Sequence, residues 1–150
     1  MSRSEKVILT NMCMVYDDEG NVLVQDRVDE DWSGLAFPGG HVEYRESFVE
    51  SVIREIKEET GLTIRHPKLC GVKQWQEEDE RYVVLFFKTK EFSGSLKSSE
   101  EGEVFWIKKE EVCNYSLAEN FEEMMEIFES EDLSEQYCYQ EQEEWRTRLF

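Results

Sequence analysis

Residues 40–62 read GHVEYRESFVESVIREIKEETGL and follow directly on the turn signal Phe37-Pro38-Gly39-Gly40. From Ser47 to Thr60 the apolar residues recur at spacings of three and four, which predicts an amphipathic helix. The apolar stripe consists of Val49, Val52, Ile53 and Ile56. Ser47 has the form of an N-cap in a capping box with Glu50, and Gly61 supplies the stop. The stretch is therefore predicted to form one helix between two glycine turns.

The other side of this helix carries carboxylates. Glu55, Glu58 and Glu59 are three or four residues apart, so they project together and away from the apolar stripe. Arg54 has Glu50 and Glu58 within one helical turn, and it neutralises only part of their charge. Hard divalent cations, which prefer oxygen ligands, are the natural complement of such a group. Glutamate is abundant in this chain, so a solvated surface face is the alternative, and composition alone leaves both interpretations open.

The flanking sequence predicts a mixture of strands and helices. Alternating or continuous apolar runs predict strands at Val7 to Tyr16, Val22 to Gln25, Leu62 to Trp75, Tyr82 to Thr89, and Val104 to Ile107. A second amphipathic helix is predicted from Glu119 to Glu129, because Phe121, Met124, Met125 and Phe128 recur at helical spacing. We expect one domain over residues 1–150, with a core at about 7–129 and an acidic C-terminal extension at 130–150 that the patterns do not assign.

Composition narrows the classes of protein. The chain has 150 residues, a formal net charge of −18 and a sequence pI of about 4.5. Such a charge repels a phosphate backbone, so we expect no nucleic acid polymer as a partner, and a polyphosphate only where divalent cations intervene. No segment predicts a membrane span or a targeting signal, which favours a cytoplasmic protein. The dispersed cysteines, which form no CxxC pair, are expected to be reduced thiols. They are Cys13, Cys70, Cys113 and Cys138.

The fixed positions of residues 40–62 resemble the Nudix box, the pattern G-x5-E-x7-R-E-U-x-E-E-x-G-U in which U is aliphatic. Every fixed position is met, with Ile56 and Leu62 as the aliphatic residues and Glu46 as the residue expected to anchor the loop. Looser similarity to the MutT-like branch runs from about Val7 to Phe128. The resemblance implies an α/β fold, an α/β/α sandwich around a mixed β-sheet, in which the box forms a loop–helix–loop.

The same resemblance implies a metal site. Glu58 and Glu59 match the main metal-binding carboxylates, and Glu55 matches a residue that binds metal or acts as general base. The carbonyl of Gly39 matches a backbone ligand. Arg54 would hold a glutamate in place through a charge-assisted hydrogen bond. The implied cofactor is Mg²⁺, with Mn²⁺ as a substitute, and the implied catalytic residues are Glu55, Glu58 and Arg54.

MutT-like enzymes add a glutamate from a loop that precedes a tryptophan-bearing strand. Glu101 is the best match, because it stands directly before Gly102 and shortly before the strand at residues 104–107. Glu100 and Glu103 are alternatives, and so is a loop in which all three glutamates are merely solvated.

Four further residues resemble substrate contacts of MutT. Arg27 and Arg81 match arginines near the substrate, Phe37 matches an aromatic residue of the nucleoside pocket, and Asn120 matches an asparagine that reads the oxidised guanine edge. The sequence departs from MutT at Ala36, which stands where MutT has a glutamate. The residue before Asn120 is Glu119, so the sequence around this asparagine also differs from that of MutT. An alternative role of Asn120 is to cap the last helix.

The resemblance implies a nucleoside triphosphate pyrophosphohydrolase that releases monophosphate and pyrophosphate and sanitises oxidised purine nucleotides such as 8-oxo-dGTP. Metal-bound water attacks phosphorus in such chemistry, so no covalent nucleophile is needed. Alternatives are hydrolysis of ADP-ribose or another nucleoside diphosphate derivative, and a non-catalytic nucleotide-binding module. A plain acidic interaction protein would not need the spacing of residues 40–62. The expected partner is a small nucleotide, and the expected assembly is a monomer or homodimer.

Overall fold

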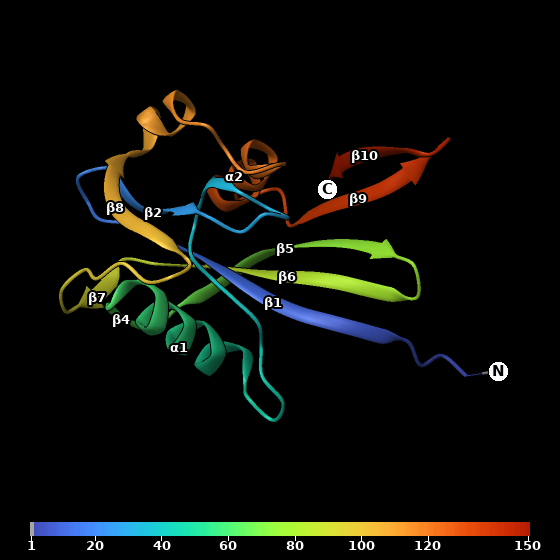
Figure 1. Cartoon of the computed structure of the whole chain (residues 1–150), viewed down its shortest axis with the longest axis horizontal. Helices are drawn as coiled ribbons and strands as arrows, with labels where there is room; N and C mark the ends of the chain where they lie inside the picture. The colour runs from blue at the N-terminus through green and yellow to red at the C-terminus, as the bar shows by residue number, and fades with distance from the viewer. Residues whose placement is uncertain (1) are drawn as a thin grey trace.

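The computed structural model, which describes residues 2–150, contains two main β-sheets that meet where Tyr16 bridges to Val22 (Figure 1). The larger sheet has the strand order β1-β6-β5-β9-β10, and the smaller has the order β3-β2-β8. The strands of the larger sheet are β1 (Lys6–Val15), β6 (Glu80–Thr89), β5 (Lys68–Glu77), β9 (Glu135–Glu141) and β10 (Glu144–Leu149). Those of the smaller sheet are β3 (Gly34–Ala36), β2 (Asn21–Arg27) and β8 (Gly102–Lys108). A short pair, β4 (Thr63–Arg65) with β7 (Glu91–Ser93), completes the strands.

The larger sheet is mixed. β1 runs parallel to β6, β6 antiparallel to β5, and β5 parallel to β9. Helices lie on both sides of it: α1 (Phe48–Thr60) packs in one hydrophobic cluster and α2 (Phe121–Glu129) in the other. A 3-10 turn, η1 (Lys109–Asn114), follows β8. The expected α/β sandwich around a mixed sheet is confirmed.

The core is divided between the two helices. Val52 and Ile56 of α1 are fully buried with Leu23 and Leu85, whereas Phe121 and Phe128 of α2 belong to a second, aromatic cluster. The four cysteines are free, as predicted. No helix within residues 2–150 has the length and apolar character required to cross a membrane.

The helix predicted between the two glycine turns is α1, and fewer of its apolar residues are buried than predicted. The Ser47 side chain accepts a hydrogen bond from the Glu50 N–H, and Gly61 ends the helix in the left-handed region at φ 82°. Val52 and Ile56 are buried, but Val49 is 44% exposed. The inclusion of Val49 in the packed stripe was wrong, because the buried face of α1 passes beside it. That face consists of Ser51, Val52, Ile56, Glu59 and Thr60, so Glu59 lies on the packed side and not away from it as predicted.

Two predicted boundaries were also wrong. The strand predicted from Leu62 to Trp75 is two strands, because His66 adopts φ 52° and Pro67 has no N–H to donate to a ladder. The helix predicted to begin at Glu119 begins at Phe121, because Asn120 adopts φ 68°.

The unassigned C-terminal extension forms the hairpin β9–β10 and lengthens the larger sheet. β9 pairs with β5 in the register Lys73↔Gln136 and Trp75↔Cys138. Gln136 and Cys138 are buried. This segment is therefore part of the packed molecule.

Candidate active site

The loop before α1 lies against β1 through three backbone hydrogen bonds, one of them from the Val42 N–H to the Leu9 carbonyl at 2.9 Å. The N–H of Asn11 donates to the Gly40 carbonyl at 2.8 Å, and the N–H of Cys13 donates to the Pro38 carbonyl at 3.0 Å. A side chain at Gly39 would place its Cβ 2.1 Å from the Asn11 carbonyl oxygen, so only glycine permits this approach. Since the carbonyls of Pro38 and Gly40 face β1, the extended backbone turns the polar groups of Gly39 to the opposite side, toward α1.

Glu59 accepts a hydrogen bond from the Gly39 N–H, which this loop conformation turns toward α1. The Gly39 N–H donates to Glu59 Oε2 at 3.0 Å, and Glu59 is only 5% exposed. The pKa of Glu59 is raised to about 7, mainly by burial and to a smaller extent by the charges of Glu55 and Glu101, against the lowering effects of the Gly39 N–H and of Arg27. The site therefore holds a carboxylate in a place where its charge is poorly compensated by the protein.

Glu55 lies beside the second glycine of the turn. A Cβ at Gly40 would lie 2.3 Å from the Glu55 carboxyl carbon, so glycine is required here to leave room for that carboxyl group. Burial raises the pKa of Glu55, while the hydrogen bond from Arg54 lowers it. Two partly or fully buried carboxylates, Glu55 and Glu59, thus lie next to the same Gly39-Gly40 turn.

Arg54 binds several groups of the loop and helix at once. Its Nε donates to Glu46 at 2.6 Å, and its Nη1 donates to Glu55 at 2.9 Å and to Glu58 at 3.2 Å. Its Nη2 donates to the His41 carbonyl at 3.0 Å. The hydrogen bond from Arg54 lowers the pKa of Glu46 to about 2. Arg54 therefore ties the loop to the helix.

Of the two glutamates one turn away from Arg54, Glu58 pairs with it as expected and Glu50 does not. The loop brings Glu46 to the guanidinium instead, and the Glu50 backbone N–H serves the Ser47 cap.

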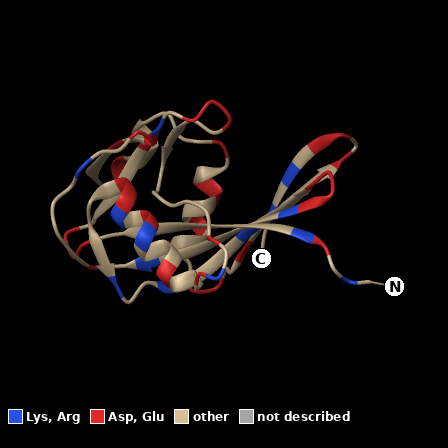
Figure 2. Ribbon diagram, turned by 60° about the horizontal axis from the view of Figure 1, so that its bottom comes forward, with Lys and Arg blue, Asp and Glu red and all other residues tan. Residues whose placement is uncertain are grey.

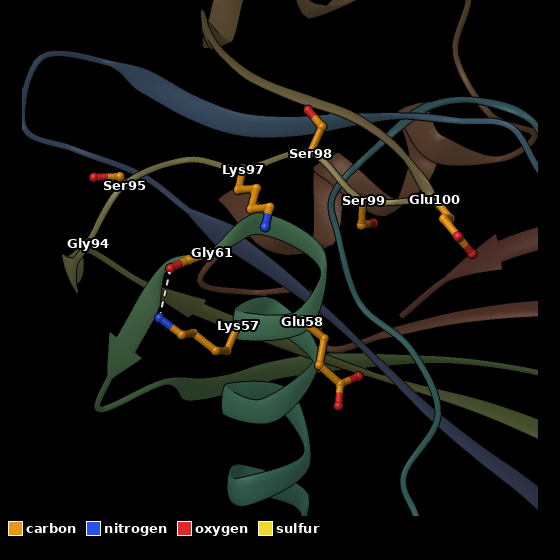
Figure 3. Close-up of a pocket in the computed structure, with 9 residues that line it drawn as sticks. All are labelled: Lys57, Glu58, Gly61, Gly94, Ser95, Lys97, Ser98, Ser99 and Glu100. Atoms are coloured by element: carbon orange, nitrogen blue, oxygen red, sulfur yellow. Dashed lines mark hydrogen bonds between the residues drawn. The ribbon is translucent and has the colours of Figure 1, made fainter.

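The remaining candidate carboxylates are more exposed. The Glu58 side chain is 59% exposed, and with Glu100 it lines a hollow between the end of α1 and the segment Gly94–Glu100 (Figure 3). Glu101 acts on Glu59 through its charge. Glu103 lies on β8 opposite Asp26 and is exposed. Within residues 2–150 no three acidic, histidine or cysteine side chains converge closely enough to hold a metal ion.

Arg27 is the expected substrate residue that lies near these glutamates. Its charge lowers the pKa of Glu59. Its Nη1 donates to Gln25 Oε1 at 3.2 Å, and its guanidinium lies 5.1 Å from the centre of the Trp32 ring. Gln25 is fully buried and its Nε2 has no hydrogen-bond partner within residues 2–150.

Phe37 and Arg81 lie elsewhere than expected. Phe37 is fully buried in the aromatic cluster of α2, with its ring edge-on to Phe121 at 4.8 Å. Arg81 is bound by Glu5 and by Gln74 at the start of β6. In the β1–β6 register Arg81 is opposite Val7, whereas the glycine turn contacts β1 at Asn11 and Cys13. The structure does not bring Arg81 to the glutamates.

Asn120 precedes α2 and does not cap it with its side chain. The capping alternative is therefore wrong. Asn120 lines a shallow hollow with Tyr115, Phe121 and Glu123, among others.

Sequence patterns missed Asn11, which supports the turn. Its Oδ1 accepts from the Gly40 N–H at 3.0 Å, and its Nδ2 donates to Ser51 Oγ at 3.0 Å. Asn11 is 3% exposed. A polar residue inside an otherwise apolar strand was the available signal, because a buried amide requires partners.

The relatives of this chain include Nudix hydrolases and a pyrophosphatase, which defines its class as that of the Nudix hydrolases. The chain belongs to the Nudix family, because it matches the NUDIX domain over residues 8–130. It is 33% identical over 116 residues to the uncharacterized Nudix hydrolase YvcI of Bacillus subtilis, a match that covers 73% of this chain and 71% of that protein. The crystal structure of the MutT protein from Bacillus halodurans is similar with a TM-score of 0.78 and 29% identity, covering 95% of this chain and 97% of that one.

Relatives with named substrates differ in those substrates. The 8-oxo-dGTP diphosphatase of Escherichia coli is 38% identical over 53 residues, which are 35% of this chain and 40% of that enzyme. Other relatives are the ADP-ribose pyrophosphatase of Methanocaldococcus jannaschii and the CTP pyrophosphohydrolase of Escherichia coli. The family is therefore shown to be that of the MutT-like Nudix hydrolases, and the substrate is not fixed by similarity.

Proposed function

We propose that this chain is a Mg²⁺-dependent pyrophosphohydrolase that converts a nucleoside triphosphate into the monophosphate and pyrophosphate. We propose an oxidised purine nucleotide of the 8-oxo-dGTP kind as its substrate, and removal of such nucleotides before they enter DNA, in the cytoplasm, as its role. The observation that carries the proposal is the buried carboxylate of Glu59, held by the Gly39 N–H beside Glu55. A cation among these groups would compensate charges that the protein itself leaves uncompensated.

The residues fit a hard divalent cation in their chemistry. Glu59, Glu55 and the Gly39 carbonyl would hold it at the buried end, and Glu58 and Glu101 would reach it by rotation of their exposed side chains. Bound Mg²⁺ would neutralise phosphate oxygens and lower the pKa of a bound water. These residues fit the cation because they supply oxygen donors and because the two glycines leave space beside them. Their side chains do not converge on one point in this structure.

The chain's own residues then have distinct roles. Glu55, whose pKa is raised, would accept a proton from the attacking water. Arg54 would position Glu55 and Glu58 through the hydrogen bonds described above. Arg27 would bind a phosphate of the substrate, because it is the cation next to Glu59.

The partner in this proposal is a free nucleotide. Asp and Glu residues, red in the ribbon of Figure 2, lie on the helices, in the loops and near the ends of the hairpins, consistent with the net charge of −18. A polyanionic polymer would be repelled along most of this surface, whereas one nucleotide needs only a local cation.

The test is incubation of the purified chain with Mg²⁺ and a panel of 8-oxo-dGTP, dGTP, CTP and ADP-ribose, with products separated by chromatography. We expect 8-oxo-dGMP and pyrophosphate to be the dominant products. Orthophosphate released together with a nucleoside diphosphate would contradict the proposed cleavage position. Preferential turnover of ADP-ribose would replace the proposed substrate with the alternative one.

A further inference from the structure

Two polar side chains are buried on the α2 side of the larger sheet, outside the glutamate site. Lys73 on β5 is 6% exposed, and Gln136 on β9 is fully buried. They are direct register partners on neighbouring strands, so their side chains leave the sheet on the same face. Neither polar atom of the Gln136 amide has a hydrogen-bond partner within residues 2–150. A buried amide without partners costs free energy, so its retention requires an explanation.

Lys73 lacks a carboxylate partner among the described residues. Its Nζ forms no ion pair with any carboxylate of residues 2–150. Burial is the largest cause that lowers the pKa of Lys73, against smaller raising effects that include Glu119 and Glu123. A hydrogen-bond acceptor supplied from outside the protein would relieve this deficit.

Tryptophan rings lie beside Lys73. The Lys73 Nζ lies 5.0 Å from the centre of the Trp75 ring and 5.9 Å from that of Trp32. Trp75 is stacked on Tyr82 with centroids 5.0 Å apart and an interplanar angle of 5°. The Trp32 Nε1 donates to the Glu119 carbonyl at 2.9 Å. Flat apolar surfaces next to polar groups are suited to a planar heterocycle.

The pair is also connected to the glutamate site. Trp32, which lies over Lys73, is the ring beneath the Arg27 guanidinium, and Arg27 is the cation that acts on Glu59. A molecule with phosphates at Arg27 and Glu59 would therefore have its heterocycle directed to Trp32 and Lys73.

We propose that Lys73 and Gln136 recognise the keto edge of a nucleobase, an edge that presents a carbonyl oxygen next to a ring N–H. This inference rests on the proposed function, since it takes the ligand to be a nucleotide, and it specifies the base. Lys73 only donates, and the Gln136 amide both donates and accepts. Together they complement guanine, 8-oxoguanine, hypoxanthine or uracil. Adenine and cytosine place an amino donor opposite Lys73 and offer no N–H to Gln136, so they are rejected.

The experiment compares inosine with adenosine nucleotides, whose bases differ only along this edge. Binding of IMP and AMP is measured without metal by quenching of tryptophan fluorescence, and kcat/KM is measured for ITP and ATP with Mg²⁺. We expect the wild type to prefer the inosine nucleotide by at least about 10-fold in both measurements, since a good bidentate contact discriminates bases by roughly 1–3 kcal/mol.

Two variants remove the contacts and two matched variants control for position. Lys73→Met and Gln136→Leu are expected to bring the IMP-to-AMP affinity ratio to within about 2-fold of unity, because each removes one half of the recognition. Lys68→Met and Gln140→Leu, at exposed positions of the same two strands, should keep the wild-type ratio. Circular dichroism confirms that each variant is folded, and the wild-type ratio tests the proposal without any variant.

Equal binding of IMP and AMP by the wild type would overturn the inference. If ITP and ATP were then both cleaved to monophosphate and pyrophosphate, the proposed hydrolase function would be supported and the proposed base recognition would be rejected. Selective binding of IMP that is lost in Lys73→Met, with no triphosphate hydrolysed, would support the recognition site and reject the proposed hydrolysis. A wild-type preference that both site variants retain would assign base recognition to other residues and overturn the inference.

Discussion

The Glu59 carboxylate is buried and receives one hydrogen bond, from the Gly39 N–H. Its charge is therefore expected to contribute strongly to the binding of a cation beside it. Glu59→Gln keeps the size of the side chain and removes the charge. We expect kcat to fall by at least roughly 100-fold, which corresponds to about 2.7 kcal/mol of transition-state stabilisation. Steady-state kinetics with the preferred nucleotide measures this. Glu110→Gln, in the exposed first turn of η1, is the control and should leave kcat unchanged. Near-normal turnover by Glu59→Gln would show that the glutamates of α1 have no catalytic role.

The raised pKa of Glu59 also predicts the pH dependence of stability in the presence of a chelator. Its pKa is about 7 in the folded chain against 4.5 as the ordinary value. Between these pH values the folded state holds a proton that the unfolded state has lost, so the free energy of unfolding falls as pH rises from about 4.5 to 7. The loss from this residue is at most about 3 kcal/mol. Urea unfolding in EDTA at several pH values measures it, and Glu59→Gln should flatten the decline. Glu46, whose pKa is about 2, contributes only below this window.

Residue patterns predicted the placement of the α1 glutamates more closely than that of Phe37 and Arg81. Glu55 and Glu59 are placed by the helix itself, since their spacing fixes their common face. Phe37 and Arg81 depend on how distant segments pack. Phe37 is taken into the core by Phe121 and Phe128, and Arg81 is bound by Glu5, which no local pattern reveals.

At the scale of elements, α1 was predictable because its start and stop are chemical signals within the segment. Ser47 and Gly61 each act on the helix that they flank. The break at His66-Pro67 and the hairpin β9–β10 were not predicted for different reasons. The break depends on a positive φ at His66, and the hairpin is an acidic segment in which only Gln136 and Cys138 are well buried. Two inward residues give too weak an alternation to separate a strand from a solvated tail.

The stop of α1 yields a prediction at this scale. Gly61 has φ 82°, and a Cβ there would lie 2.6 Å from the Ser95 carbonyl oxygen. Gly20 has the similar φ of 85° with no atom within 4 Å of the built Cβ. Gly20→Ala should therefore lose only the left-handed penalty of about 1–2 kcal/mol, and Gly61→Ala should lose more, because the segment 94–97 must move. Urea denaturation of both variants compares them. Equal losses would show that the contact with Ser95 is relieved without cost.

For the whole molecule, the two sheets hold the helix and the glycine turn in place before any cation binds. The loop is fixed to β1 by Asn11 and Cys13, and it is fixed to α1 by Arg54 and Glu59. The carboxylates of the site therefore repel one another in the folded chain even without a bound cation. A cation that binds only the folded state should therefore stabilise the entire chain by mass action, since the fold and the site are one cooperative unit.

The expected result is a melting temperature that rises with Mg²⁺ concentration in the wild type and returns to its starting value on addition of EDTA. At 100 times the dissociation constant the stabilisation should reach about 2.7 kcal/mol. Glu59→Gln should begin with a higher melting temperature in EDTA at pH 7.5, because one repelling buried charge is gone, and it should gain less from Mg²⁺. Glu110→Gln should behave as the wild type does. Activity is measured in the same samples, and EDTA should abolish it. Full turnover in metal-free buffer, or an equal Mg²⁺-dependent shift in Glu59→Gln, would contradict a cation site at the Gly39-Gly40 turn.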